Sequence, residues 1–286
     1  SLQFAMIPMN FMKQGGFAQY ADTGTWSSKA MKEAKLFGEV QVVASSKADN
    51  YTYIPAFNTW EPISEEASYL HITSNNTIYG TQYQDFPDSK CPMIADMSSD
   101  IMSRKFDMNK FAMIYAGAQK NLGPSGVAVC IIRKDLVSRT PANVPTMLRY
   151  ETFTKANSLY NTPPTYGIYM IALVTDWIKE IGGIDAIEKI NNAKAAALYA
   201  AIDASEGYYN CPVHKASRSR MNVVFRLPNE DLEAKFVKEA KAAGMIGLKG
   251  HRSVGGIRAS IYNAMPMEGV EKLVAFMKKF EEAHQA

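Results

Sequence analysis

The pattern of apolar and polar positions predicts two helices near the start of the chain. Apolar side chains between residues 1 and 12 recur at intervals closer to a helical repeat than to strict alternation, and Ser1 could cap this helix. After a polar turn at 22–25, a second helix is expected from Trp26 or the next residue to about residue 37. Its apolar face would consist of Ala30, Met31 and Ala34.

Five short β-rich runs are expected next, separated by polar or glycine-rich segments. They are residues 39–44, 69–73, 92–96, 113–116 and 127–132. This arrangement resembles a mostly parallel sheet with helical crossovers, so the fold class is α/β.

Helical spacing dominates from residue 164 onward. A helix is expected from Pro164 to the Gly182–Gly183 pair and another from about 184 to 204, and this long helical segment would bridge two domains. The remaining elements are expected to be a strand at 222–227, a helix at 229–243, a short strand near Met245, a strand at 257–262 and a last helix. In the last helix Val270, Leu273, Val274, Met277 and Phe280 follow the helical repeat.

Length and composition fit an ordinary globular protein of two domains. A chain of 286 residues exceeds the size at which one hydrophobic core usually keeps growing, so we expect a large domain over 1–190 and a small one over 191–286. Hydrophobic residues make up 47% of the chain and charged residues 21%, and no apolar run approaches a membrane span. A formal charge of +3 gives no reason to expect a nucleic-acid surface.

The three cysteines favour a reducing compartment. Cys91, Cys130 and Cys211 are an odd number and lack the spacing of metal ligands, so we expect reduced thiols in a cytoplasmic protein and no metal site. No basic segment followed by an apolar one opens the chain, so a secretory signal is not expected.

Lys120 and Asp96 are the residues with the most distinctive chemistry. Lys120 is a lone amine in a turn of small residues after an apolar strand, and Asp96 ends another apolar strand. An enzyme that uses pyridoxal phosphate needs an amine to hold the cofactor aldehyde and an anion against its pyridine nitrogen. Both residues lie at strand ends, where open α/β sheets bind their ligands.

Each of these two residues also has a plain structural explanation. An acid at a strand end often caps a helix or forms a turn, and a lysine among glycines is often a solvated loop residue. A phosphate-binding P-loop is disfavoured by spacing, since Gly117 lies only three residues before Lys120 and Asn121 follows it. The pair therefore matters more than either residue alone.

Four segments in order give the chain a specific resemblance. Residues 95–99, 114–126, 160–164 and 249–260 resemble the phosphoserine aminotransferases, a class-V family of fold type I pyridoxal-phosphate enzymes. The resemblance implies an aspartate-aminotransferase-like fold, with a large domain around a mostly parallel, seven-stranded type of sheet and a smaller C-terminal α/β domain. It also implies a homodimer with the active site at the subunit interface.

The same resemblance implies a reaction. 3-Phosphohydroxypyruvate and L-glutamate would give O-phospho-L-serine and 2-oxoglutarate in serine biosynthesis. Whether 4-phosphohydroxythreonine, a substrate in pyridoxine biosynthesis, is also used stays open, because it shares the phosphate and amino-acid ends.

Residue roles around the cofactor also come from the resemblance. Lys120 would hold the cofactor through its aldehyde and move a proton at the substrate, and Asp96 would pair with the pyridine nitrogen. Trp26 would stack on the ring and Thr77 would bond its phenolic oxygen. The cofactor phosphate would be bound by Ser1, Gln119 and, from the partner subunit, Asn161 and Thr162. Without the family, Trp26 would be a packed aromatic and Asn161 part of a plain turn.

Substrate recognition is expected from the segment around residues 251–258. By the resemblance Arg258 binds the α-carboxylate, while His251 and Arg252 bind the distal phosphate or carboxylate. Arginine suits planar, bidentate recognition of such groups, although a cluster of this kind can also be a solvated basic loop. The other histidines, His71, His214 and His284, are expected to be structural.

Several expectations concern departures from the family. Its members carry several dozen residues before the position of Ser1, including most of a phosphate-binding glycine turn, so the N-terminal part of the family fold is expected to be absent here. One alternative is therefore an inactive, cofactor-free dimeric scaffold. Another is a related desulfurase or alanine:glyoxylate aminotransferase, but a desulfurase needs a mobile nucleophilic cysteine and no cysteine lies in a suitable loop.

Overall fold

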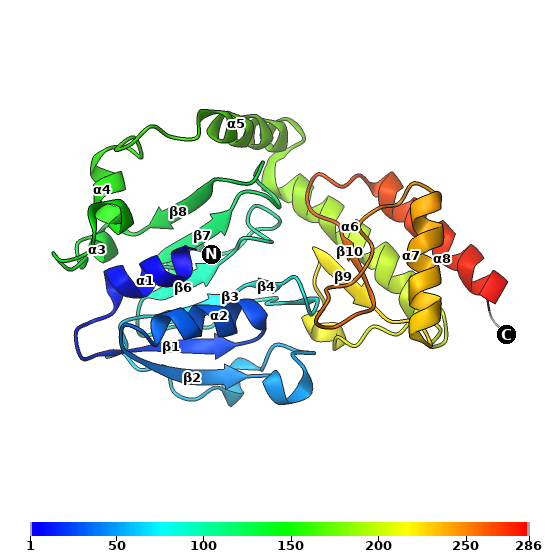
Figure 1. Ribbon diagram of the computed structural model, residues 1–286, viewed down its shortest axis with the longest axis horizontal. Helices are drawn as coiled ribbons and strands as arrows, with labels where there is room; N and C mark the ends of the chain where they lie inside the picture. Colours follow the sequence, from blue (N-terminus) through cyan, green and yellow to red (C-terminus); the bar gives the residue numbers. More distant parts are fainter. Residues whose placement is uncertain (1, 285–286) are drawn as a thin grey trace.

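A six-stranded sheet is the scaffold of the first part of the chain in the computed structural model, which describes residues 2–284 (Figure 1). The strand order is β2 (Glu39–Ser45), β1 (Phe17–Asp22), β3 (Leu70–Thr73), β6 (Met93–Asp96), β7 (Met113–Gly117) and β8 (Ala128–Ile132). All neighbours pair in parallel except β7 and β8. The predicted mostly parallel sheet is confirmed, but within residues 2–284 it has six strands rather than seven.

Helices and an aromatic cluster cover the two faces of this sheet. On one face, α1 (Gln3–Phe11) and α2 (Thr25–Ala34) pack their apolar residues against β1, β3, β6 and β7. The other face packs against a cluster that includes Tyr83, Phe86 and Phe111. Both predicted helices are confirmed, although α2 ends three residues early. The proposed cap Ser1 lies outside the described residues.

The sequence pattern missed the second strand in the sheet order and mispredicted one short strand. β1 contains Gln19 and Asp22, both buried, so it is not a continuous apolar run. The Gln19 side chain is satisfied by its own bonds, donating to the Pro62 carbonyl at 3.1 Å and accepting from the Ser64 amide at 2.9 Å. The short hairpin of β4 (Asn75–Asn76) and β5 (Thr81–Gln82) was also not expected. The strand expected near Met245 is wrong, because this residue lies in the turn that ends a helix.

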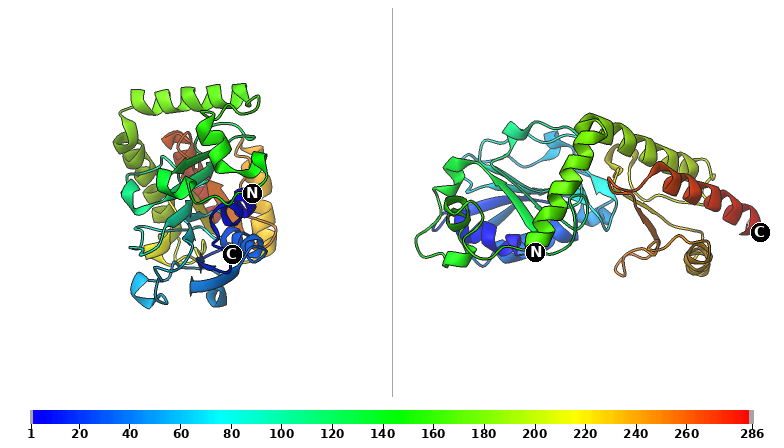
Figure 2. Two further views of the ribbon diagram at one scale, coloured as in Figure 1. Left: turned by 90° about the vertical axis from the view of Figure 1, so that its left-hand side faces the viewer. Right: turned by 90° about the horizontal axis from the view of Figure 1, so that it is seen from above.

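The second part of the chain forms a smaller body beside the first (Figure 1). Its antiparallel strands β9 (Asn222–Phe225) and β10 (Ile257–Ser260) pack with α7 (Glu230–Ala242), α8 (Met267–His284) and α6 (Gly183–Asp203). The preceding helix α5 (Thr165–Glu180) runs over the first body, and α6 continues from it into the second, as Figure 2 shows. Two short helices, α3 (Lys134–Val137) and α4 (Tyr150–Lys155), follow β8. Apart from the strand expected near Met245, the helices and strands predicted after residue 164 are confirmed, while α3 and α4 were not predicted.

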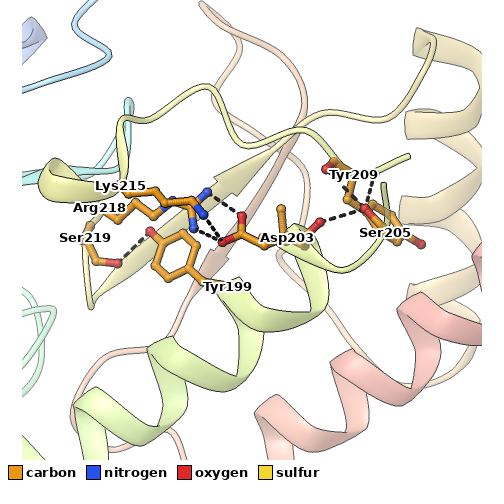
Figure 3. Close-up of polar contacts among 8 residues, drawn as sticks. Tyr199, Asp203, Ser205, Tyr209, Lys215, Arg218 and Ser219 are labelled. Carbon is orange, nitrogen blue, oxygen red and sulfur yellow. Dashed lines mark hydrogen bonds and ion pairs between the residues drawn. The ribbon is translucent and has the colours of Figure 1, made fainter. Parts of the chain in front are cut away.

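An ion-pair cluster ties the end of α6 to the segment that leads into β9. Arg218 donates two bonds to Asp203, at 2.7 and 2.8 Å, and lies over the ring of Tyr199 at 4.6 Å (Figure 3). The Tyr199 hydroxyl donates to the carbonyl of Ser219 at 2.9 Å. A bidentate pair with an additional aromatic contact holds this segment in one geometry.

Buried polar side chains connect α6 to the segment after β10, which forms the seam with the first body. Lys194 of α6 is fully buried, and its ammonium donates to the carbonyls of Ile261, Tyr262 and Met265 at 2.8–3.1 Å. Asn263, in the same segment after β10, receives a bond from Asn191 at 2.8 Å. A second set of bonds extends this seam toward the first body: the amide N–H of Asn263 donates to Asn121, the residue after Lys120, at 3.1 Å. The exit of β10 is thereby tied to the Lys120 loop.

None of the helices within residues 2–284 combines the length and the apolar character that a membrane span requires.

Replacing Lys194 tests the importance of this seam. Lys194→Met keeps most of the side-chain volume but leaves three buried carbonyls without their donor, so we expect the free energy of unfolding to fall by about 2–4 kcal/mol in urea denaturation. Lys189→Met, at an exposed position of the same helix, is the control and should change it by less than about 0.5 kcal/mol. Equal unfolding curves for Lys194→Met and the unchanged protein would contradict this role.

Candidate active site

A cavity of about 360 Å³ opens at the carboxyl ends of β6 and β7. Its lining includes Trp26, Asn75, Asp96, Tyr115, Gln119 and Lys120. Asp96 is the last residue of β6, and Lys120 lies three residues beyond the end of β7. The parallel register places Asp96 beside Tyr115, and the sheet thus brings the predicted carboxylate and amine to one cavity.

The Lys120 loop is a tight turn between β7 and β8. The Ala118 carbonyl accepts from the amides of Leu122 and Gly123, at 3.1 and 2.8 Å, and the Ala118 amide donates to Val127 at 3.0 Å. The turn leaves the Lys120 side chain half-buried, with its ammonium 6.0 Å from the centre of the Trp26 ring.

The surroundings of Lys120 favour its neutral amine. Burial lowers the pKa of Lys120 below its ordinary value, and the positive charge of Arg258 lowers it further, while Asp96 and Asp100 act in the opposite direction. A neutral amine is the form that attacks an aldehyde and accepts a proton.

Asp96 is held by the loop that follows it. The carboxylate is buried, and its Oδ1 accepts from the Ser98 amide at 2.9 Å. The Ser98 hydroxyl oxygen accepts in turn from the Gly117 amide at 3.1 Å, which connects this loop to the start of the Lys120 loop. Asp96 does not act as the cap of a helix, since the residues after it form only turns.

Trp26 and Thr77 are joined to the substrate-binding segment by hydrogen bonds. The indole Nε1 of Trp26 donates to the Thr77 hydroxyl oxygen at 3.1 Å, and the Thr77 carbonyl accepts from the Arg258 guanidinium at 3.2 Å. Trp26 lines the cavity with its ring, whereas Thr77 is buried behind it and is not part of the lining. The ammonium of Lys29 also lies near Trp26, 4.9 Å from the centre of its ring.

His251 and Arg258 line a second cavity of about 390 Å³ on the side of the smaller body. The Ser253 amide donates to His251 Nδ1 at 3.3 Å, and the Ser253 hydroxyl lies 2.7 Å from the same nitrogen. In the neutral ring Nδ1 is therefore an acceptor and Nε2 carries the hydrogen. Burial and the charges of Arg258, Arg252 and Lys29 lower the pKa of His251. Arg252 itself is exposed and is absent from the described linings of both cavities.

Two of the four predicted phosphate ligands, Asn161 and Thr162, are not part of the lining of this cavity. Asn161 and Thr162 are exposed, and the Asn161 side chain donates only to the Thr162 carbonyl, at 3.1 Å, among the bonds of the described residues. Gln119 lines the cavity but is exposed at its rim. Ser1 lies outside the described residues. The placement of Asn161 and Thr162 away from this cavity is compatible with the expectation that they serve a partner's site.

Tyr115 and His71 were missed as site residues by sequence reasoning. Tyr115 lines the cavity, and its hydroxyl lies 3.0 Å from Nε2 of His71 on β3. The sequence predicts a structural role for His71 and gives Tyr115 no role of its own within the segment 114–126. No local pattern reveals either role, because both depend on the register of three parallel strands.

The lining has the donor set that pyridoxal phosphate requires. A half-buried amine, a buried carboxylate and an indole ring surround one cavity, and they match the aldehyde, pyridine nitrogen and aromatic face of that cofactor. The residues present therefore fit the group.

Comparison with known proteins agrees with this chemistry. The family model for class-V aminotransferases matches residues 1–273. The phosphoserine aminotransferase of Niallia circulans is 56% identical over 282 residues, which are 98% of this chain and 78% of that protein.

Two solved structures show the similarity in space. Phosphoserine aminotransferase from Bacillus circulans subsp. alkalophilus matches with a TM-score of 0.97 and 56% identity, covering 99% of this chain and 78% of that one. Phosphoserine aminotransferase from Trichomonas vaginalis, solved with pyridoxal phosphate bound, matches with a TM-score of 0.91 and 41% identity, covering 97% and 79%.

Proposed function

The chain belongs to the class-V aminotransferase family, and on that premise we propose that it is a phosphoserine transaminase that uses pyridoxal phosphate. It exchanges the amino group between L-glutamate and 3-phosphohydroxypyruvate, giving 2-oxoglutarate and O-phospho-L-serine in serine biosynthesis. The observation that carries this proposal is that the amine of Lys120 and the carboxylate of Asp96 line one cavity with the ring of Trp26.

Each cofactor contact is assigned to a residue by its chemistry. Asp96 is the anion for the pyridine nitrogen, Trp26 is the stacking surface, and Thr77, which orients Trp26 through its hydroxyl, is the partner for the phenolic oxygen. Gln119 at the rim, with Ser1, is a donor for the phosphate. When bound, the cofactor supplies an aldehyde for the covalent link and a ring that withdraws electrons from the substrate carbon.

Lys120 is the group that moves the proton. Because burial and Arg258 lower its pKa, the free amine is populated more than in an ordinary lysine, and Nζ can hold a proton taken from the α-carbon of the amino donor. Asp96 and Asp100 keep the pKa from falling further, so the same nitrogen can carry that proton before returning it. The centre of the Trp26 ring lies 6.0 Å from this nitrogen.

The cations of the smaller body select dianionic substrates. Arg258, oriented by the Thr77 carbonyl, is placed to bind the α-carboxylate, and His251 presents its Nε2–H because Ser253 occupies Nδ1. The exposed Arg252, next to His251 in the chain, is the further cation that we assign to the distal phosphate or side-chain carboxylate. One cationic site accepts both donors, and the shared phosphate end supports 4-phosphohydroxythreonine as a further substrate in pyridoxine biosynthesis.

The rival functions lack support from the described residues. A desulfurase needs a thiolate, but burial raises the pKa of all three thiols, to about 12 for Cys130. An inert scaffold would have no need to keep the amine, the carboxylate and the stacking ring around one cavity.

Two further statements extend the proposal. We place the boundary between a large domain (1–190) and a small domain (191–286) within α6, because the apolar cluster of the second body shares no residue with the clusters around the sheet. Two calorimetric unfolding transitions would support this boundary, and a single transition would not.

We also place the protein in the cytoplasm, where its three free thiols stay reduced. Recovery of the protein in a secreted fraction would contradict this location.

A transamination assay with chemical trapping tests the function. The purified protein with pyridoxal phosphate should convert O-phospho-L-serine and 2-oxoglutarate to glutamate, and borohydride treatment should fix the cofactor on the peptide that contains Lys120. Lys120→Ala should lower kcat by at least about 10³-fold, because it removes both the covalent link and the base. L-serine, which lacks the phosphate, is the matched control substrate and should react far more slowly. Label on another lysine, or equal rates for both donors, would refute the assignment.

We also propose a homodimer in which Asn161 and Thr162 of each chain reach the cofactor phosphate of the other. Large apolar side chains are exposed beside these residues and along α5. They are Leu159 (63% exposed), Tyr160 (52%), Tyr166 (70%), Tyr169 (58%) and Leu173 (43%). This apolar patch lies next to Asn161 and Thr162, which do not line the cavity of their own chain. An interface through the patch would bring these two residues to the cavity of the partner.

Sedimentation of charge variants tests this interface. The unchanged protein should sediment with the mass of two chains, and Tyr166→Asp combined with Tyr169→Asp should shift it to one chain and weaken cofactor binding, because charges would be buried in the interface. Ile246→Asp, at a position that is 79% exposed in the smaller body, is the control and should leave the dimer intact. A single-chain mass for the unchanged protein would exclude the proposal.

A further inference from the structure

The loop that carries His251 and Arg252 has little apolar packing to hold it. It spans residues 250–256 and leads into β10, and most of its residues are at least partly exposed. Among the described residues, no member of this loop belongs to an apolar cluster. The position of its two cations must therefore be fixed by polar contacts.

Backbone hydrogen bonds close this loop on itself. The Gly250 amide donates to the Gly256 carbonyl at 2.8 Å, and the His251 carbonyl accepts from the amides of Val254 and Gly255, at 3.0 and 2.9 Å. A β-carbon on Gly250 would lie 1.9 Å from the Gly255 carbonyl oxygen, so the two arms of the loop touch through their backbones. All of these bonds are internal to the loop, and they do not tie it to the rest of the smaller body.

An ion pair outside the loop makes that connection. Arg226 directly follows β9, and its Nε donates to Oε1 of Glu233, near the start of α7. Arg226 Nη1 donates to the Val254 carbonyl at 3.0 Å, and Glu233 Oε2 accepts from the Gly256 amide at 3.1 Å. The pair thus holds the loop by one carbonyl and one amide, two residues apart.

The loop fits closely against this pair. Gly256 has a φ of 71°, and a β-carbon on it would lie 2.7 Å from Cδ of Arg226 and 2.9 Å from the Phe225 carbonyl oxygen. Glu233 is 7% exposed, and a carboxylate so buried is costly unless donors satisfy it. Hydrogen bonds to charged groups are the stronger ones in proteins, so the pair specifies one position for the loop.

Arg226 also lines the cavity that His251 and Arg258 line. Its Nε and Nη1 are engaged by Glu233 and by the Val254 carbonyl, and the Glu233 carboxylate neutralises its charge. These contacts suit Arg226 to placing the loop, and not to binding an anion of its own.

We propose that Arg226 and Glu233 are positioning residues that set the preference for substrates with a distal anion. They do so by holding the loop where His251 and Arg252 reach the distal phosphate or carboxylate. This inference rests on the proposed transamination of O-phospho-L-serine, and it adds the residues on which discrimination between phosphorylated and plain donors depends.

The site for the α-carboxylate is held independently of this pair. Arg258 lies within β10, opposite Val224 of β9, and its guanidinium donates to the Thr77 carbonyl at 3.2 Å. Loss of the ion pair should therefore weaken recognition of the distal group and spare recognition of the α-carboxylate.

Matched variants separate this role from general stability. Glu233→Gln keeps the shape of the side chain but replaces one of the two accepting oxygens by an NH2 group. Arg226→Lys keeps the charge but lacks a second nitrogen for the Val254 carbonyl. Asp203→Asn is the control, because it weakens the ion pair with Arg218 in the same body (Figure 3). In both pairs one side chain is largely buried and the other partly exposed, and the control pair is bonded to no residue of the loop in the described structure.

The first measurement is kcat/KM for O-phospho-L-serine and for L-serine at saturating cofactor. Single-turnover decay of the cofactor absorbance quantifies the slow donor as well. Glu233→Gln and Arg226→Lys should each lower kcat/KM for O-phospho-L-serine about tenfold or more, mainly through KM, since each disturbs hydrogen bonds to charged groups. The value for L-serine, which has no distal anion, should change less than about threefold. Asp203→Asn should leave the ratio of the two values within about twofold.

Two further readouts locate the effect in the loop. Hydrogen–deuterium exchange of the peptide that contains Gly256 should become about tenfold faster in Glu233→Gln, because that amide loses its acceptor. The dissociation constant of pyridoxal phosphate should stay within about twofold, because neither Arg226 nor Glu233 belongs to the described lining of the cavity around Lys120.

The outcomes distinguish this inference from the proposed function. If the unchanged protein prefers O-phospho-L-serine and both variants keep that preference, the role of the pair in specificity is refuted and the function stands, even if exchange in the loop becomes faster. An equal loss of preference in Asp203→Asn would refute it too. Equal values of kcat/KM for the two donors in the unchanged protein would refute the proposed function itself.

Discussion

The pairing of β6 with β7 is the constraint on which the site depends. This parallel pair brings Asp96, at the end of one strand, and the Lys120 loop, after the other, to the same edge of the sheet. The Ser98 hydroxyl then connects the two loops through the Gly117 amide. An amine and a carboxylate that are 24 positions apart in sequence therefore meet around one cavity, and a slip of one residue would turn Asp96 to the other face.

The surroundings of this cavity keep the Lys120 amine and the Asp96 carboxylate from forming an ion pair with each other. Burial and the charge of Arg258 lower the pKa of the Lys120 amine, while Asp96 accepts a hydrogen bond from the Ser98 amide. A direct ion pair between them would remove the free amine that the chemistry needs. The Trp26 ring lies near the Lys120 amine and is held by Thr77, whose carbonyl also orients Arg258. One short segment after β3 thus coordinates the stacking surface and the substrate-binding cation.

Local patterns could predict most elements and the chemically distinctive residues of the site. Apolar periodicity gave α6, α7 and α8 closely, because each buries apolar residues at helical spacing. It also gave α5, although only Gly167 and Ile178 of that helix are buried in the single chain. It failed for β1, whose Gln19 and Asp22 are buried and satisfied by tertiary hydrogen bonds that no local pattern reveals. Lys120, Asp96 and Arg258 were identifiable because their motifs are specific. The bond between His71 and Tyr115 was not predictable, since it exists only once β3, β6 and β7 have taken their register.

The protonation of the cofactor's pyridine nitrogen tests the central claim most directly, because that is where Asp96 acts. Pyridoxal phosphate labelled with ¹⁵N at this nitrogen can be bound to the protein and its ¹⁵N chemical shift measured. The account predicts the shift of a pyridinium in the unchanged protein and of a neutral pyridine in Asp96→Ala. A neutral pyridine in the unchanged protein would contradict it.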